Sequence, residues 1–326
     1  RRTFVADVTG SQGGLEVANP TDSLLSSVNA STSLLGTLGY QFNRDHEVSL
    51  LVLGLTNAEN QAATASGPET LSAMQDQVNN RLQFTQRQLL FTQLKGFHRL
   101  SALADLELEW QANYGRVERS EPDIRDSRYF VSPDTRELNL RLQPNSAERF
   151  FLGLTEDSAG GTASATLPWR ALRLEVGGFG QYQARRFEGR RFRFFELRRP
   201  TPTGLAEDVL TADRIGPGAG TQFFLAESTI AQDSYTSTLA TYGGFGLVEW
   251  KFNDALRAQA GLRYEGSSQS VAVFSPFATD ANAKPPVTRQ YHNPVPSLNV
   301  AWSPVSSVNL RAAYAYTLAR PSFREL

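Results

Sequence analysis

The sequence predicts an all-β protein, an antiparallel up-and-down transmembrane β-barrel of which about ten strands are visible. Three observations lead to this prediction. Apolar and polar residues alternate along the predicted strands, short and long connections between the strands follow each other in strict order, and aromatic residues stand at the short connections. We expect residues 1–326 to form part of one such domain.

The alternation has a period of two, which places successive side chains on opposite faces of a strand. Even positions of 106–114 and of 256–264 are apolar, whereas the odd positions between them are mostly charged or amide residues. We therefore expect the even positions to face lipid. The predicted strands begin near Leu34, His46, Arg81, Leu100, Thr162, Ala171, Thr236, Ala255, Tyr291 and Val308.

The connections distinguish a membrane barrel from a soluble β-sandwich. The five short ones are expected at Asn43–Asp45, Phe97–Arg99, Pro168–Arg170, Asn253–Asp254 and Ser303–Ser307. Long polar stretches, expected as loops, lie between them near residues 58–80, 119–161, 187–233 and 266–290. In a meander, this order places every short turn at one end and every long loop at the other, as in outer-membrane barrels. A sandwich with Greek-key connections has no reason to keep it.

Aromatic residues support the same assignment, because a barrel needs them where its apolar band meets the lipid headgroups. Phe42, Trp169, Phe252 and Trp302 each lie at or next to a short turn, and each falls on the apolar parity of its strand. We expect these four to form a membrane-interface girdle at the turn end. Phe97 has the opposite parity and is not included.

Composition excludes several other classes. The net charge is −1, from 32 basic and 33 acidic residues, so no overall field attracts nucleic acid. There is no cysteine, which removes disulfides, thiolate nucleophiles and Cys-bound metals. The longest comparable apolar run is Leu50–Leu55, far below the ~18 residues of a spanning helix.

We find no signature of an enzyme, a cofactor site or a metal site. The sequence lacks G-x-S-x-G, H-E-x-x-H, a P-loop and a dinucleotide-binding glycine motif. His46, His98 and His292 stand singly on turns or strand starts. The three acidic residues between Glu121 and Asp126 are spaced like part of a calcium loop but lack its glycine and terminal Glu, so we expect an exposed loop.

The densest basic cluster contains seven arginines interleaved with phenylalanines: Arg185, Arg186, Arg190, Arg191, Arg193, Arg198 and Arg199. Three interpretations remain open. The cluster binds an anionic ligand, such as a metal chelate or, on the outer wall, lipopolysaccharide phosphate. It stacks on single-stranded nucleic acid. Alternatively, it is a strand entering a solvated loop, paired with Glu188, Glu196 and Asp208.

The first interpretation makes the five arginines from Arg185 to Arg193 candidate ligand-binding residues. Its motive is that so many like charges repel one another unless something negative lies close. Glu188 and Glu196 alone are too few.

From residue 81 onward the sequence resembles the C-terminal β-barrel of TonB-dependent receptors. The segments that carry the resemblance are Glu121–Arg125, Gly261–Glu265, Gln290–Val300, Asn309–Arg311 and Thr317–Leu326. Residues 1–33 contribute little to it.

The resemblance implies a barrel of 22 strands with an N-terminal plug that contacts TonB, in the outer membrane of a Gram-negative bacterium. It implies import of a scarce solute, a siderophore, metal chelate, vitamin or oligosaccharide. We expect the plug and the C-terminal strands to lie outside this chain, and lipid, lipopolysaccharide and the TonB complex to be partners.

Two other functions remain possible from the sequence. A passive porin or a structural outer-membrane scaffold would share the barrel features without a plug. A secreted soluble β-protein, such as an adhesin, would need a second sheet to bury its apolar faces.

Overall fold

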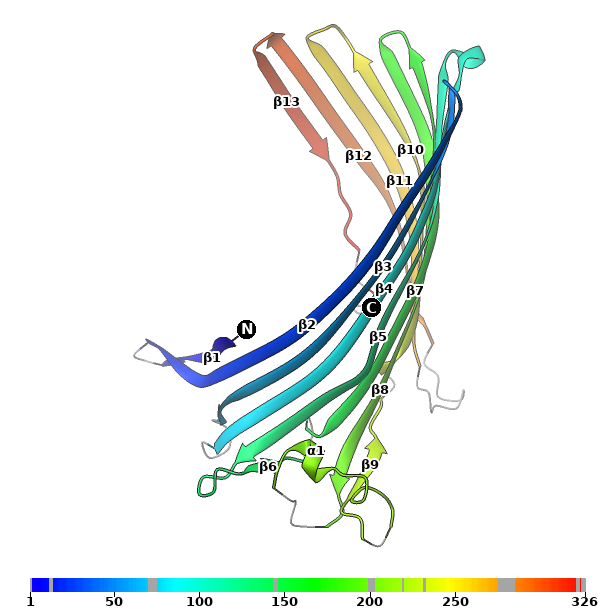
Figure 1. Cartoon of the computed structure of the whole chain (residues 1–326). Coiled ribbons are helices and arrows are strands. Elements are labelled where there is room, and N and C mark those ends of the chain that lie inside the picture. Colours follow the sequence, from blue (N-terminus) through cyan, green and yellow to red (C-terminus); the bar gives the residue numbers. More distant parts are fainter. Residues whose placement is uncertain are drawn as a thin grey trace.

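The computed structural model describes residues 2–11, 14–69, 75–142, 146–198, 203–218, 220–230, 233–274, 285–320 and 323. Within these ranges the strands form one 13-stranded sheet (Figure 1). Its strands are β1 Arg2–Ser11, β2 Gly14–Asn43, β3 His46–Glu69, β4 Gln75–Leu100, β5 Leu106–Val131, β6 Leu138–Leu140, β7 Glu148–Trp169, β8 Leu172–Glu196, β9 Phe223–Glu227, β10 Tyr235–Lys251, β11 Leu256–Val273, β12 Val287–Val305 and β13 Val308–Ala315.

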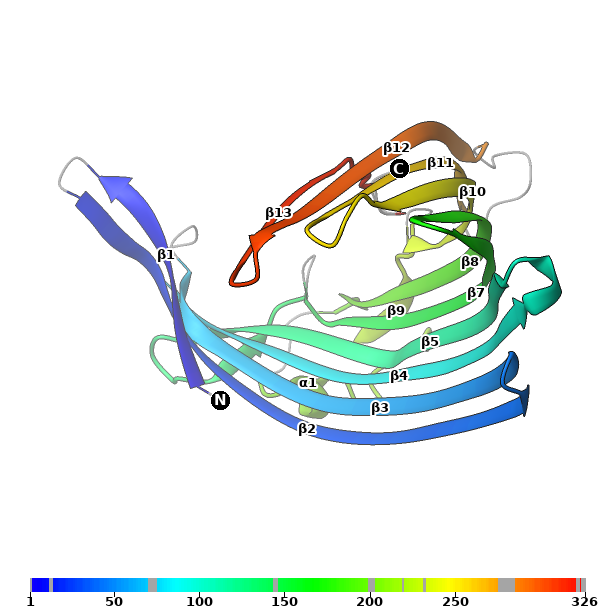
Figure 2. The ribbon, with the colours of Figure 1, turned by 90° about the horizontal axis from the view of Figure 1, so that it is seen from above.

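The sheet is an antiparallel meander, as the sequence predicts. Neighbours follow the order β1-β2-β3-β4-β5-β7-β8-β10-β11-β12-β13, while the short β6 and β9 pair with β5 and β8. All ten predicted segments are strands of this path, and β1 is an additional one. Seen from above, the sheet bends into an open half-pipe with β1 and β13 at its two edges (Figure 2).

The two faces of the curved sheet differ in burial and in chemistry. Side chains converge on the inside of a curved sheet and diverge on its outside, so the inner face is the more buried. On β11, Ser267 and Gln269 are each 2% exposed, whereas Leu262 is 58% exposed. The odd positions of β11, which include Ser267, therefore lie on the concave face. The apolar even positions of 106–114 and 256–264 lie on the convex face, as expected for lipid contact.

The short turns gather at one end of the sheet, called the turn end below, with one correction. Residues Phe97–Arg99 are not a turn but the last part of β4, because Leu100 still pairs with Leu106. The chain reverses instead through a 3-10 turn, η1 (Ser101–Leu103), and two left-handed residues, Ala104 and Asp105, both with φ of 57°.

The long polar stretches are a second correction, because much of each is strand rather than loop. β3 continues to Glu69, β5 to Val131 and β8 to Glu196. Beyond the apolar band both faces of a strand meet water, so polar residues occupy both and the alternation is lost.

At this opposite end, called the loop end, a short helix α1 (Ala206–Val209) completes the described elements. It packs in a small core around Tyr129, Leu140, Val209 and Phe223. No helix in the described ranges is long and apolar enough to cross a membrane.

Candidate functional site

Five of the seven clustered arginines lie on β8 at the loop end, and the pleat divides them between the two faces, whereas Arg198 follows the strand. Arg185, Arg191 and Arg193 project from the concave face, because the odd positions of β8 align through β10 with the odd, concave positions of β11. Arg186 and Arg190 project from the convex face. The five predicted site residues therefore do not form one site. Arg199 lies outside the described residues.

The two convex arginines are paired with protein carboxylates. Arg190 donates to both oxygens of Glu227, from Nε at 3.0 Å and Nη2 at 2.8 Å. This contact lowers the pKa of Glu227 and raises that of Arg190. Arg186 donates from Nε to Glu188 at 2.7 Å.

The concave arginines are engaged as well. Arg185 donates to Glu156 at 2.5 Å, and Arg191 donates to Asp233 at 3.1 Å. The guanidinium of Arg193 lies over the ring of Phe195, 4.3 Å from its centroid. Glu156, Glu227 and Asp233, which lie outside the cluster, thus balance arginine charge that the neighbouring carboxylates in the sequence cannot balance. Crowding of the arginines therefore does not by itself require an anionic ligand.

The phenylalanines of β8 are also occupied. Phe187 stacks on Tyr235, Phe195 stacks on Phe224, and Phe192 meets Phe151 edge-on. Stacking of nucleobases requires free aromatic faces. This geometry favours a strand that enters a solvated region over a nucleic-acid platform.

A depression of about 340 Å³ lies at the loop end between β3, β4, β5, β7 and β8, next to Arg191. Arg81, Arg128, Asp126 and Glu148 supply its charged groups. Burial raises the pKa of Asp126, against the opposing influence of Arg81 and Arg128.

Three of the side chains that line the depression have unused hydrogen-bonding capacity. The Asn79 Oδ1 and Asn80 Oδ1 acceptors and the Arg191 Nε donor are buried and have no hydrogen-bond partner among the described residues. A buried polar atom without a partner costs free energy, and a bound molecule or water removes that cost. The depression is therefore the strongest candidate for a solute contact.

A β-bulge shapes the wall beside this depression. β5 holds one more residue than β4 or β7 around Pro122 and Asp123, where both pairings change register. As a result Glu121 and Ile124 both project into the concave face and are each 2% exposed. The expected exposed loop at Glu121–Asp126 is thus wrong, because these residues belong to a paired strand.

Asp123, the bulged residue, projects from the convex face. It accepts hydrogen bonds from Arg149 and from Arg125, the latter at 2.7 Å. Burial alone would raise the pKa of this carboxyl, but the two guanidinium groups together leave it below its usual value. No group of three or more His, Cys, Asp or Glu side chains in the described ranges is arranged to hold a metal ion.

Toward the turn end the concave wall is polar and cross-linked between strands. Glu107 accepts from Arg99 at 3.0 Å and from Arg173 at 3.1 Å, which joins β4, β5 and β8. Gln93 donates to Gln111 at 3.2 Å. Glu107 and Glu109 both lie on the concave face of β5, and two arginines neutralise the charge of Glu107.

Comparison with known proteins gives the family. The model of the TonB dependent receptor-like β-barrel family matches residues 19–326. The chain belongs to this family. Its members are outer-membrane transporters rather than enzymes, so the chain is part of an outer-membrane β-barrel. No curated protein matches the sequence.

Solved structures of several receptors and transporters resemble the chain at low sequence identity. The copper transporter OprC is 14% identical, with a TM-score of 0.49 over 95% of this chain and 46% of its own. The ferric citrate transporter FecA is 10% identical, with a TM-score of 0.46 over 90% and 41%. The siderophore receptor PiuA from Acinetobacter baumannii is 10% identical, with a TM-score of 0.43 over 92% and 49%. The chain thus spans less than half the length of each.

Within this outer-membrane barrel, the four predicted turn-end aromatics all lie on strand ends or turns and are 46–63% exposed. The sequence prediction did not include a second aromatic row on the convex face. It consists of Tyr114, Tyr182, Tyr242, Tyr264 and Tyr314, all 39–61% exposed. Tyr114, Tyr182, Tyr242 and Tyr264 each lie at or near the last apolar position before the strand becomes polar, and this signal could have revealed the row.

Sequence reasoning also missed a histidine pair. The register of β3 and β4 brings His46 and His98 together, with their Nδ1 atoms 3.2 Å apart. Trp110 Nε1 donates to His98 Nε2 at 3.1 Å, so that nitrogen carries no proton and the His98 proton resides on Nδ1, facing His46. The three rings form one hydrogen-bonded link across β3, β4 and β5.

Proposed function

We propose that the full-length protein is a TonB-dependent importer of a scarce solute, and that the solute contacts the concave wall at the loop end. The observation that carries this proposal is the depression with its unpartnered Asn79 acceptor and Arg191 donor. Within the proposal, the siderophore, metal chelate, vitamin and oligosaccharide classes all remain candidates. Arg191 favours a solute that presents oxygen acceptors, such as carboxylates or hydroxyls.

The orientation follows from the two aromatic rows. Tyr242 on β10 and Phe252, the residue after that strand, are ten positions apart, and a strand tilted across the hydrocarbon layer needs ~9 to 11 residues. We propose that Phe42, Trp169, Phe252 and Trp302 mark the periplasmic interface. The tyrosine row then marks the outer interface, and the loop end faces the cell exterior, as in outer-membrane barrels generally.

We propose a ligand-binding role for only some of the five predicted arginines. Arg185, Arg191 and Arg193 face the interior and are available to the transport path, whereas Arg186 and Arg190 face outward. A plug domain inside the barrel and the TonB complex acting through it are the proposed partners, since the energy for uptake must reach the solute site from the inner membrane.

The test is uptake of labelled candidate solutes by cells that express the full-length protein. Uptake should require TonB and should fall several-fold in Arg191→Gln, because the loss of one charge-assisted hydrogen bond costs about 1.5 kcal/mol or more. Arg190→Gln is the matched control, since it has the opposite orientation on the same strand and should transport normally. Uptake that continues without TonB would support the passive porin instead.

A further inference from the structure

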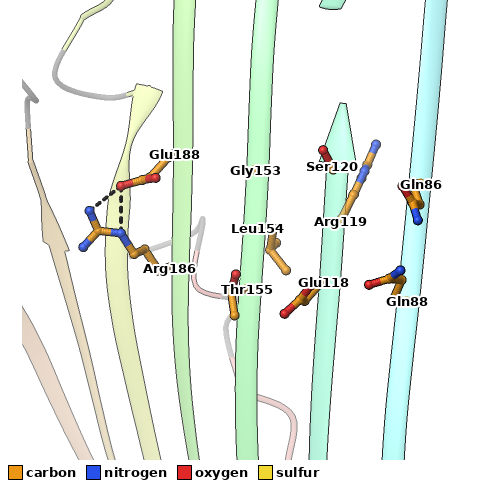
Figure 3. A pocket seen from close by; sticks show the side chains of 10 residues that line it. All are labelled: Gln86, Gln88, Glu118, Arg119, Ser120, Gly153, Leu154, Thr155, Arg186 and Glu188. Carbon is orange, nitrogen blue, oxygen red and sulfur yellow. Dashed lines mark hydrogen bonds and ion pairs between the residues drawn. The ribbon is translucent and has the colours of Figure 1, made fainter. Parts of the chain in front are cut away.

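A polar groove crosses the convex face just beyond the tyrosine row, over β4, β5, β7 and β8 (Figure 3). Its volume is about 330 Å³. Its convex-face side chains are amides, hydroxyls and charged groups, including Gln86, Gln88, Glu118, Ser120, Thr155 and Arg186. Pairing aligns four of them in one row, from Gln88 through Glu118 and Thr155 to Arg186.

The groove begins where the apolar wall ends. Glu118 lies four residues beyond Tyr114 on β5, and Arg186 lies four residues beyond Tyr182 on β8. This separation corresponds to about 13 Å along a strand and less along the tilted membrane normal. Below the two tyrosines, the convex positions of these strands are small or apolar, such as Ala112 and Val176. A lipid whose acyl chains cover this wall would place its headgroup in the groove.

The charges in and around the groove nearly cancel. Arg116 donates to Glu118 at 2.7 Å and approaches Asp157 at 3.4 Å, while Arg186 is held by Glu188. With Arg119 and its partner Glu121 counted as well, three cations face four carboxylates, a formal charge of −1 that disfavours a bare phosphate. Carboxylates and amide oxygens accept hydrogen bonds from hydroxyl groups, and guanidinium and amide N–H groups donate to them. This mixture suits a neutral, hydroxyl-rich partner.

We propose that this groove binds the sugar headgroup of an outer-leaflet glycolipid, with the acyl chains of that lipid on the apolar convex wall below. The site faces away from the interior and is separate from solute capture. The inference rests on the proposed orientation, in which the loop end faces the cell exterior.

The test uses the purified full-length protein in detergent and native mass spectrometry. Rough lipopolysaccharide and its dephosphorylated form are the glycolipid probes, and phosphatidylglycerol is the lipid without a sugar headgroup. The affinities of the two glycolipids for the protein should agree within about twofold. The double variant Gln88→Ala/Glu118→Gln should bind both about tenfold more weakly, since two lost hydrogen bonds amount to roughly 1.4 kcal/mol or more, which is a factor of ten.

Two controls make the result decisive. Arg190→Gln changes the same residue type as Arg186, on the same face, four residues farther from the membrane, and should leave binding unchanged. The double variant should not change phosphatidylglycerol binding. Unchanged glycolipid binding by the double variant, or loss of binding on dephosphorylation, would overturn the sugar assignment.

If the double variant fails to fold, Thr155→Val tests the same row and should weaken the binding of both glycolipids by a smaller factor. Unchanged binding by that variant counts against the proposal. Because binding in detergent needs neither TonB nor a membrane orientation, the outcome is independent of whether the protein imports a solute.

Discussion

Asp123 and Arg149 form a two-point contact between β5 and β7, with Nε to Oδ1 at 2.8 Å and Nη2 to Oδ2 at 2.6 Å. It secures the bulged segment of β5 to its neighbour outside the membrane. Asp123→Asn should therefore weaken local protection of the β5 and β7 amides at the loop end by about 1–2 kcal/mol, allowing for partial exposure of Arg149. Hydrogen exchange of the full-length protein measures this, and unchanged protection would exclude the contact as a stabilising one.

The same contact predicts a pH dependence. The folded-state pKa of Asp123 lies below its unfolded value, so its contribution is fully present above the unfolded value, near pH 4, and is lost as pH falls through the folded pKa. Loop-end protection should thus fall in acid in the wild-type protein and much less in Asp123→Asn. An equal acid response in both proteins would contradict this assignment.

Asp126, three residues away on the opposite face, predicts the reverse behaviour. Burial raises its pKa, so the stability associated with its protonated form is present below the unfolded value and is lost as pH rises through the folded one. At pH 7 the charged group is a local cost, and its ion pair with Arg81 is long, at 3.5 Å. Asp126→Asn should leave exchange protection unchanged or increase it. A loss equal to that of Asp123→Asn would show that the Arg81 pair matters more than burial.

Gly243 permits a close approach of strands on the concave face. A Cβ there would lie 2.3 Å from the Tyr264 carbonyl oxygen and 2.8 Å from the Phe179 ring. Gly243→Ala should destabilise the barrel by about 1–3 kcal/mol through overpacking. Gly180→Ala is the control, because nothing lies within 4 Å of its Cβ position. Urea unfolding of the refolded protein compares the two, and equal stability would contradict the packing at Gly243.

Much of the fold is predictable from the sequence because alternation is strong wherever one face of a strand meets lipid. All ten strands expected from it are present. The signal disappears beyond the tyrosine row, where both faces are polar, so strand β3 continues through residues that the sequence predicts as loop. The bulge at Pro122–Asp123 is visible only through the pairing of β5 with both neighbours.

The candidate site is less predictable for a similar reason. The density of arginines on β8 can be seen in the sequence, but their partners cannot, because Glu156, Glu227 and Asp233 are 29 to 42 positions away. Nor does composition show that the pleat sends Arg190 and Arg191 to opposite faces. The two histidines of the pair are 52 positions apart, so their proximity can likewise be recognised only from the β3–β4 register.

The tryptophans test the proposed turn-end interface. Trp169 and Trp302 lie at strand ends beside turns, whereas Trp110 lies four residues inside the start of β5. In single-tryptophan variants of the full-length protein in bilayers, lipids brominated near the headgroup should quench the fluorescence of Trp169 and Trp302 most. Trp110 should respond more to bromines deeper in the acyl chains. A deep position for Trp302 would place the interface elsewhere.

If this sheet is a barrel wall, lipid lies on its convex face and the aqueous interior on its concave face. Spin labels at single cysteines introduced at each position from 256 to 265 test this arrangement most directly, and the chain has no cysteine of its own. In bilayers, the spin labels at even positions should be relaxed mainly by oxygen, which concentrates in lipid. The spin labels at odd positions should be relaxed mainly by a water-soluble nickel chelate. Absence of this alternation, or its inversion, would contradict the assignment of lipid to the convex face.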